Sequence, residues 1–296
     1  MRTIVQQGTR CTALAGYVRP DTLDSALAAR AKGLRVAAGC TDLFAAVRGP
    51  ALSGGILDIT AIPELRAISE TPEHWRLGAT ATWSDIRLAP LPPAFDGLKA
   101  AARELGAAQV QNAGTLGGNL VNASPAADGA PCLLTLEAEV ELASRRGTRR
   151  LALGDFLTGP RQTALAEDEL LTAVLVPKSA AAGHGAFLKL GARRFLVISI
   201  AMAAARLDLD GGRVRHAALA VGACSATARR LPAAEAALAG ARADAGLAAA
   251  ITADLVVPGL SPIDDLRASA DYRAAAAVTL LRRAVAGLCT GREAAA

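Results

Sequence analysis

The chain has 296 residues, which is long enough for two or three small domains with sizeable cores. Hydrophobic residues make up 52% of it, yet no apolar run is as long as a membrane span, and the polar N-terminal residues lack the apolar segment of a signal peptide. The net charge of +5 comes from dispersed arginines and only 3% of the residues are aromatic, so we expect a cytoplasmic protein that does not bind nucleic acid.

The first predicted elements are a helix and a short strand. Residues 20–33 have the pattern of a helix that Asp21 or Thr22 caps and that Gly33 ends. Residues 34–38 predict a short strand, which leads through the turn GCTD into a helix-like run. A strand, a glycine turn and the start of a helix form a geometry that aims backbone N–H groups at an anion.

The next segments predict strands and helices in alternation. Residues 54–60 predict a strand, and residues 75–86 predict a strand followed by the start of a helix. Thr82 and Asp85 have the spacing of a capping box at that helix start. Residues 97–108 predict a longer helix, which leads directly to a glycine-rich segment.

The middle of the chain predicts a hairpin and then a domain boundary. Residues 132–144 begin as a buried or helical run and end with strand-like alternation. Arginines crowd residues 144–150, where Gly147 marks the expected turn, so we interpret them as the solvated tip of a hairpin. Small residues at 178–185 follow a strand and a proline stop, and we place the domain boundary there.

The C-terminal part predicts a small sheet and alanine-rich helices. Residues 185–194 and 199–223 have strand character, and DGGR in the second run predicts a hairpin turn. Three helices are expected, at residues 231–240, 246–255 and 271–288. The fold class predicted for the whole chain is α+β, with small sheets and helices rather than a long βαβ series.

The sequence lacks the motifs of several enzyme classes. GxSxG, GxxxxGK[ST] and GxGxxG are absent, which argues against a serine hydrolase of that type, a P-loop nucleotidase and a Rossmann dinucleotide site. The five cysteines include no CxxC pair, and the three histidines, His74, His184 and His216, form no close pair. We therefore expect no metal or iron–sulfur site in this chain and assign no catalytic residue.

Two neutral turns that contain glycine remain as candidate binding elements, AGCTDL at 38–43 and GTLGGN at 114–119. Neither includes a lysine, so a pyrophosphate would be held between them by backbone N–H groups. Asp42 and Asp128 would suit hydroxyl groups, because ionised carboxylates only accept hydrogen bonds. FAD combines a pyrophosphate, two polyol segments and flat rings, although two ordinary turns explain the same residues.

Several longer motifs resemble one protein family and follow one another in the order found in that family. They are AGCTDL, LGATATWSDI, NAGTLGGNLVNASPAAD, GPRQTALAEDELLTAVLVP, FLKLGARR and DDLRASADYR. Together they are similar to the FAD-binding medium subunit of the molybdenum hydroxylases, the family of xanthine dehydrogenase and carbon monoxide dehydrogenase. The resemblance covers nearly the whole chain. It implies a FAD-binding domain of the vanillyl-alcohol-oxidase type at residues 1–178, with subdomains of about 1–57 and 58–178, and a smaller C-terminal domain at 183–290 with a three-stranded antiparallel sheet and helices.

The resemblance also implies cofactor-binding roles for individual residues. Two loops would wrap the FAD pyrophosphate, the first being Val36, Ala37, Ala38, Gly39, Cys40, Thr41, Asp42 and Leu43, and the second Thr115, Leu116, Gly117, Gly118 and Asn119. Asp128 matches an acidic residue that bonds the cofactor, and Leu105 and Leu171 match positions that line the flavin or the adenine. Lys189 matches a lysine near the isoalloxazine ring, where a cation would favour the anionic reduced flavin; the alternative is a lysine stretched along the surface.

Two positions depart from the family pattern. Cys40 stands where the family usually has a second glycine, and a cysteine adopts positive φ less easily, so either its backbone has β or bridge geometry or the loop differs locally. An aromatic residue covers the flavin in some relatives, and Phe195 is the nearest candidate for it here, although a core residue at the start of a strand is the simpler interpretation.

The function that the resemblance implies is electron transfer. A large molybdopterin-binding subunit would oxidise the substrate, a small subunit would carry two [2Fe–2S] clusters, and FAD in this chain would pass the electrons to NAD or another acceptor. The cysteine pattern agrees, since this chain offers no set of cluster ligands. Two alternatives stay open: a free-standing FAD-dependent oxidoreductase of the same fold, and an assembly protein that has lost FAD.

Overall fold

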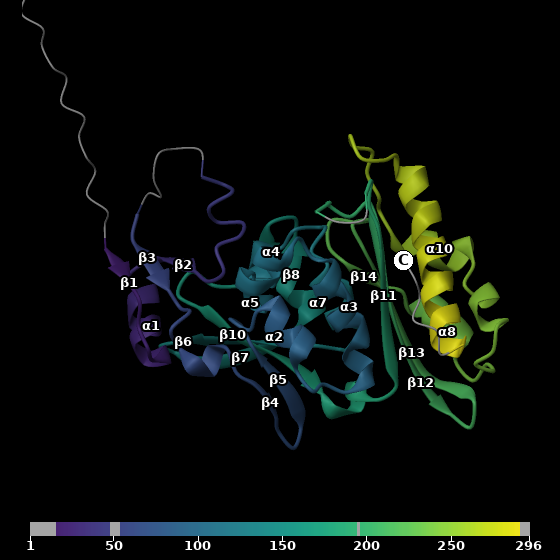
Figure 1. The fold of residues 1–296 in the computed structure, drawn as a ribbon, viewed down its shortest axis with the longest axis horizontal. Coiled ribbons are helices and arrows are strands. Elements are labelled where there is room, and N and C mark those ends of the chain that lie inside the picture. The colour runs from purple at the N-terminus through teal and green to yellow at the C-terminus, as the bar shows by residue number, and fades with distance from the viewer. Residues whose placement is uncertain (1–15, 48–53, 194–195, 291–296) are drawn as a thin grey trace, which may run out of the picture.

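A computed structural model describes residues 16–47, 54–193 and 196–290, whose elements lie in three parts along the long axis of the molecule (Figure 1). A small sheet lies at the N-terminal end, and a five-stranded sheet covered by short helices is in the middle. A four-stranded sheet backed by helix α10 (Ala270–Thr290) forms the other end. This combination of separate small sheets and helices confirms the α+β class.

The N-terminal sheet is parallel, and its strands in sheet order are β1 (Tyr17–Val18), β3 (Ile56–Asp58) and β2 (Arg35–Ala37). Helix α1 (Leu23–Arg30) packs on this sheet through alanines and a leucine that meet Leu57 in a small core. Thr22 caps the helix, because its side chain accepts a hydrogen bond from the Ser25 N–H. Gly33 follows the helix with a φ of +80°, as its predicted role requires.

The central sheet is antiparallel, and its strands in sheet order are β4 (Ile68–Glu70), β5 (His74–Gly78), β10 (Leu170–Pro177), β6 (Glu139–Ser144) and β7 (Gly147–Ala152). Strands β6 and β7 form the predicted hairpin, and Gly147 has a φ of +126° in its turn. The hairpin arginines are paired: Arg146 lies 2.5 Å from Asp168 and Arg149 lies 2.6 Å from Glu169. The basic cluster is therefore partly neutralised by acids within the same part of the fold.

Short elements connect these strands: α2 (Trp83–Leu88), α3 (Asp96–Glu104), α4 (Ala108–Ala113), α5 (Leu116–Asn122), α6 (Gly129–Thr135), α7 (Leu153–Phe156), β8 (Leu157–Gly159) and β9 (Gln162–Thr163). The predicted capping box is confirmed, since Thr82 and Asp85 bond each other's backbone N–H at the start of α2. The single helix predicted at 97–108 is wrong in its extent. Helix α3 ends at Glu104, and Gly106 with a φ of +59° separates it from α4.

The C-terminal sheet is antiparallel, with strands β11 (His184–Leu190), β12 (Ala201–Asp210), β13 (Arg213–Gly222) and β14 (Arg229–Arg230). The resemblance implied three strands; the fourth, β14, has two residues and pairs with the end of β13. Alternate residues of β12 face opposite sides, so Met202 and Ala204 pack in the central core while Ala203 and Ala205 pack on the C-terminal helices. Besides α10, these helices are α8 (Pro232–Leu238) and α9 (Ala253–Val256). The helix predicted at 246–255 is instead a 3₁₀ turn at Leu247–Ala250 followed by α9.

Candidate functional site

The first predicted FAD loop leaves the edge strand β2 of the N-terminal sheet after Ala37. Residues 38–43 form no strand, and Asp42 is exposed on this loop. The backbone N–H groups of residues 39–43 have no hydrogen-bond acceptor within the described parts of the chain. A run of such donors on an exposed turn can bind an anion without a cationic side chain.

Cys40 lies in the left-handed backbone region, with a φ of +59°. The sequence left open whether Cys40 has β or bridge geometry or whether the loop differs locally. Its backbone has neither geometry but the conformation that a glycine adopts easily. This conformation costs other residues about 1–2 kcal/mol. Its thiol donates to the Ala38 carbonyl at 3.3 Å, and burial together with the nearby Asp58 carboxylate raises its pKa. The thiol is therefore kept protonated, and a reactive thiolate beside the loop is disfavoured.

The second predicted loop is the start of helix α5, and its backbone donors, apart from the Thr115 N–H, are already used. The Thr115 hydroxyl accepts from the Gly118 N–H at 3.1 Å and so caps the helix. The N–H groups of Leu116 and Gly117 donate at 2.9 and 2.8 Å to carbonyls of residues 79–81. The sequence led us to expect two equivalent anion cradles, but the two turns differ. The first has a run of unused backbone donors, whereas in the second only the Thr115 N–H has no acceptor among the described residues.

The fold brings the two loops into contact. A Cβ added to Gly39 would collide with the carbonyl of Ala113, and it would lie 2.9 Å from the Cα of Gly114. A Cβ on Gly117 would lie 2.8 Å from both the Cβ and the carbonyl oxygen of Ala79. Glycine is needed at both positions because backbone from distant segments approaches so closely.

Asp128 and Lys189 form a buried ion pair. The Lys189 Nζ lies 2.7 Å from one carboxylate oxygen of Asp128, and the Ser199 hydroxyl donates to the other oxygen at 2.7 Å. The two charged side chains are only 5% and 6% exposed. Burial raises the pKa of the Asp128 carboxyl, while Lys189 and Ser199 oppose that rise. Lys189 is therefore not a surface lysine but the direct partner of another predicted site residue.

The remaining predicted residues lie near the central core. Leu105 is half-buried after α3, and Leu171 is 4% exposed on β10 beside a bulge in the sheet. A place for either residue beside a flavin or an adenine stays a prediction. Phe195, the candidate aromatic cover, lies outside the described residues.

Two buried polar atoms near the second loop lack hydrogen-bond partners within the described chain. They are the Thr80 hydroxyl and the Asn119 side-chain oxygen. Thr80 lies before α2, between Ala79 and Ala81, whose carbonyls accept hydrogen bonds from the second loop. It is not among the site residues predicted from the sequence. The only sequence signal was its place inside the motif LGATATWSDI. Buried polar atoms usually have a partner, so these two are compatible with a polar ligand beside the loop.

Metal binding and membrane insertion have no support in the described ranges. No three His, Cys, Asp or Glu side chains there are placed to hold a metal ion together. Within the same ranges, no helix combines the length and the apolar character that crossing a membrane requires.

Comparison with protein families gives a result that is independent of this geometry. Residues 10–179 match the FAD binding domain in molybdopterin dehydrogenase. The chain belongs to this family. Residues 186–288 match the C-terminal domain of CO dehydrogenase flavoproteins. This member of the molybdopterin dehydrogenase flavoproteins is thus the FAD-binding subunit of a molybdenum hydroxylase-type oxidoreductase, with FAD as its cofactor, as the motifs indicated.

Individual relatives agree with the family. The chain is 32% identical over 232 residues to the nicotine 6-hydroxylase medium subunit of Paenarthrobacter nicotinovorans. The aligned residues cover 78% of this flavoprotein and 80% of that subunit. It is 38% identical to the nicotinate dehydrogenase FAD-subunit of Eubacterium barkeri over 149 residues, about half of each chain. The structure of carbon monoxide dehydrogenase from Hydrogenophaga pseudoflava, in a form that lacks the molybdenum-pyranopterin moiety, matches with a TM-score of 0.83 at 30% identity, covering 92% of this chain and 96% of that one.

Proposed function

We propose that this chain is the electron-transfer subunit of a three-part molybdenum hydroxylase. FAD, when bound, supplies the ability to take electrons one at a time from the [2Fe–2S] clusters of a small partner subunit and to deliver them to NAD or another acceptor. Substrate oxidation belongs to a large molybdopterin-binding partner, so no residue of this chain needs to act as a general acid or base. The relatives support this division, because they are named as medium or FAD subunits.

The close approach of the two glycine loops is the observation that carries this proposal. Because Gly39 packs on Ala113, the unused N–H groups of residues 39–43 lie beside the start of α5. We propose that the first loop, Val36 to Leu43, donates to the FAD pyrophosphate. Residues 115–119 then provide a close-packed surface for the cofactor, with the polar atom of Asn119 available to it.

The buried pair of Asp128 and Lys189 would complete the cofactor site. Asp128 keeps unused lone pairs that could accept from a cofactor hydroxyl, and Lys189 and Ser199 hold the carboxylate in one orientation. Since Lys189 is neutralised by Asp128, it acts mainly by positioning this carboxylate, and its effect on the charge of a reduced flavin is reduced. In the same proposal, Leu105 and Leu171 line the flat rings.

The proposal extends to domain organisation. We propose a FAD-binding domain of the vanillyl-alcohol-oxidase type at residues 1–178, with subdomains of about 1–57 and 58–178, followed by a C-terminal domain at 183–290. The two family matches support it, since they fall on either side of residues 180–185. A cytoplasmic location belongs to the same proposal, and cell fractionation tests it.

An exposed apolar surface near the proposed flavin site is a candidate contact for the iron–sulfur partner. Leu266 is 93% exposed and Ile198 is 54% exposed. The Arg273 guanidinium links their segments, because it donates to the Ile200 carbonyl and to the Asp265 carboxylate, both at 2.6 Å. Ile198 also precedes Ser199, which bonds the proposed site residue Asp128. Contiguous patches of exposed apolar side chains mark protein interfaces, and we propose that Ile198 and Leu266 belong to one such patch.

Purification with and without the neighbouring gene products tests the function. We expect a yellow chain with flavin absorbance that co-purifies with a molybdopterin subunit and an iron–sulfur subunit. A colourless chain that takes up no added FAD would contradict the proposal and favour the assembly protein. A flavin-containing chain that reduces its acceptor without partners would favour a free-standing oxidoreductase.

A further inference from the structure

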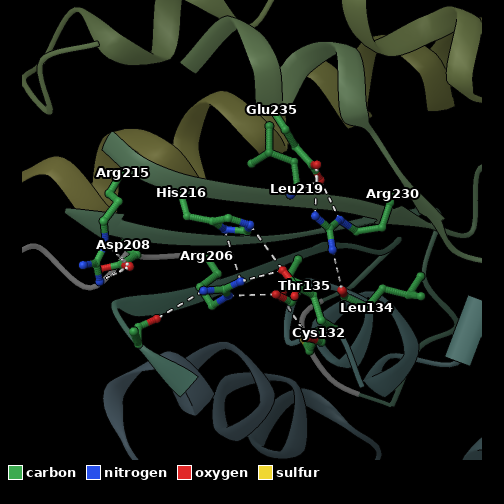
Figure 2. A network of polar contacts seen from close by, with 12 residues as sticks. Cys132, Leu134, Thr135, Arg206, Asp208, Arg215, His216, Leu219, Arg230 and Glu235 are labelled. Carbon is green, nitrogen blue, oxygen red and sulfur yellow. Dashed lines mark hydrogen bonds and ion pairs between the residues drawn. The ribbon is translucent and has the colours of Figure 1, made fainter. Parts of the chain in front are cut away.

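Helix α6 is buried along its whole length, so the polar groups at its ends must find partners inside the protein. Its N-terminal end follows Asp128, which is held by Lys189 and Ser199. At its C-terminal end, the Thr135 carbonyl accepts from the Arg206 Nε at 2.8 Å, and the Leu134 carbonyl accepts from Arg230 at 2.9 Å. Figure 2 shows these two arginines reaching the helix end from strands β12 and β14 of the C-terminal sheet.

Arg206 is an unusual residue for its position. It lies on β12 on the same side as Met202 and Ala204, which pack in the central core, and it is 1% exposed. Burial lowers the pKa of its guanidinium, and a buried cation is costly unless its hydrogen bonds are satisfied. An apolar side chain would be accommodated more easily there, so the charge must serve the groups that it contacts.

The other partners of Arg206 hold it in one orientation. Its Nη2 lies 3.3 Å from the His216 Nδ1 (Figure 2). The same Nη2 donates to the Glu137 carboxylate at 3.1 Å, and Nη1 donates to the Ala182 carbonyl at 3.3 Å. Glu137 has a φ of +51° just after α6, a position that favours glycine. A glutamate at this strained position provides the carboxylate that Arg206 needs.

Both ends of α6 are therefore attached to one sheet. Lys189 of β11 pairs in register with Met202 of β12, and Arg206 is four residues further along β12. Four strand residues span about 13 Å, and the seven residues of α6 span about 10 Å. The sheet thus holds the helix near both ends, and a shift of α6 along its axis is opposed by Lys189 at one end and by Arg206 at the other.

We propose that Arg206 is a positioning residue for the cofactor site: by holding the C-terminal end of α6, it sets the place of Asp128 at the other end. This inference rests on the proposed function, in which Asp128 bonds the cofactor. It assigns a role in FAD binding to a residue outside the glycine loops and outside the FAD-binding domain.

A double-mutant cycle on FAD affinity tests the inference. Arg206→Met removes the charge and the donor to Thr135, and we expect it to raise the FAD dissociation constant by about tenfold. The second background is Asp128→Asn/Lys189→Met, in which both members of the ion pair are neutral. There, Arg206→Met should change the dissociation constant by less than about twofold, because the residue through which it acts has already been altered. The visible circular dichroism of the bound flavin should change only in the first background.

Arg215→Met is the matched control. Arg215 lies on the adjacent strand near Arg206, its side chain is 60% exposed, and it pairs with Asp208 rather than with α6 (Figure 2). It should leave the dissociation constant unchanged. If Arg206→Met does not fold, Arg206→Lys, which keeps the charge but has a single donor nitrogen in place of three, should weaken FAD binding by a few-fold.

Three outcomes would overturn the inference. Equal effects of Arg206→Met in both backgrounds would show that it does not act through Asp128. A lower unfolding midpoint with an unchanged dissociation constant, for either Arg206 variant, would show a structural role alone. If Asp128→Asn/Lys189→Met itself binds FAD as tightly as the unmodified chain, the place of Asp128 in the cofactor site is wrong, and the inference fails together with that assignment.

Discussion

Replacing Lys189 with methionine would leave the Asp128 carboxylate buried with Ser199 as its only other side-chain partner among the described residues. Removing one member of a buried ion pair typically costs about 3–5 kcal/mol, because an uncompensated charge stays behind. Both side chains here are less than a tenth exposed, so solvent screens the pair very little. We therefore expect Lys189→Met to lower the free energy of unfolding by an amount in this range at neutral pH.

The loss should depend on pH in a defined direction. Burial already raises the pKa of Asp128 above its ordinary value, and without Lys189 it should rise further. A folded-state pKa above the unfolded value means that the folded state binds the extra proton, so its stability is greatest below the unfolded pKa and is lost as pH rises through the folded pKa. Between those two pKa values, the free energy of unfolding should fall by about 1.4 kcal/mol per pH unit. The free energy of unfolding of Lys189→Met should thus be closer to that of the unmodified chain in mild acid than at neutral pH.

Urea unfolding at several pH values measures this effect. Trp75 and Trp83 both lie in the central part of the fold and report its unfolding by fluorescence. The matched control is Asp128→Asn/Lys189→Met, which replaces both charges and should recover most of the lost stability and show no added pH dependence. A Lys189→Met chain that loses less than about 1 kcal/mol at every pH, or a double variant as unstable as the single one, would refute the buried pair.

Three further predictions concern the loops and the partner surface. Cys40→Gly should raise the free energy of unfolding by about 1 kcal/mol because it relieves the positive φ. Cys289→Gly in helix α10 should lower it by about the same amount. If chemical denaturation shows that both substitutions change the free energy of unfolding in the same direction, the backbone argument is contradicted. Gly117→Ala should destabilise the chain, since its Cβ would meet Ala79 at 2.8 Å. Among the described residues, the Cβ of Gly118→Ala would meet the Thr115 hydroxyl alone, so this variant should mainly weaken FAD binding, measured by flavin titration. Similar unfolding midpoints for the two variants would argue against this difference. Leu266→Glu should reduce co-purification of the iron–sulfur subunit while the flavin content stays unchanged, and undiminished co-purification would remove this surface from the proposed interface.

Local features of the fold were readable from the amino-acid order. The helix cap at Thr22, the capping box of Thr82 and Asp85 and the hairpin turn at Gly147 were predicted and confirmed. Each depends on groups within a few residues of one another, so a short pattern contains all the partners. The extent of α3 was misjudged because Gly106 was read as part of a helix, although its positive φ ends the helical path.

The candidate site was readable only as a set of separate motifs. Their order identified the family, which the family comparison confirmed, but it could not say that two of the predicted residues bond each other. Asp128 and Lys189 are 61 residues apart in the chain and 2.7 Å apart in space. In the same way, the second loop looked like a free backbone cradle until the fold placed the carbonyls of residues 79–81 against its N–H groups.

Cys40 and Arg206 mark the limit of inference from the chain alone. The resemblance to the family identifies Cys40 as a departure from glycine, but its left-handed backbone is visible only in the folded chain. Arg206 looks like one polar residue in an alternating strand, and nothing near it in sequence indicates the buried helix end that it satisfies. Short-range hydrogen bonds and turn geometry are determined by neighbouring residues, whereas burial and the pairing of charges are properties of surfaces that exist only after distant segments have packed together.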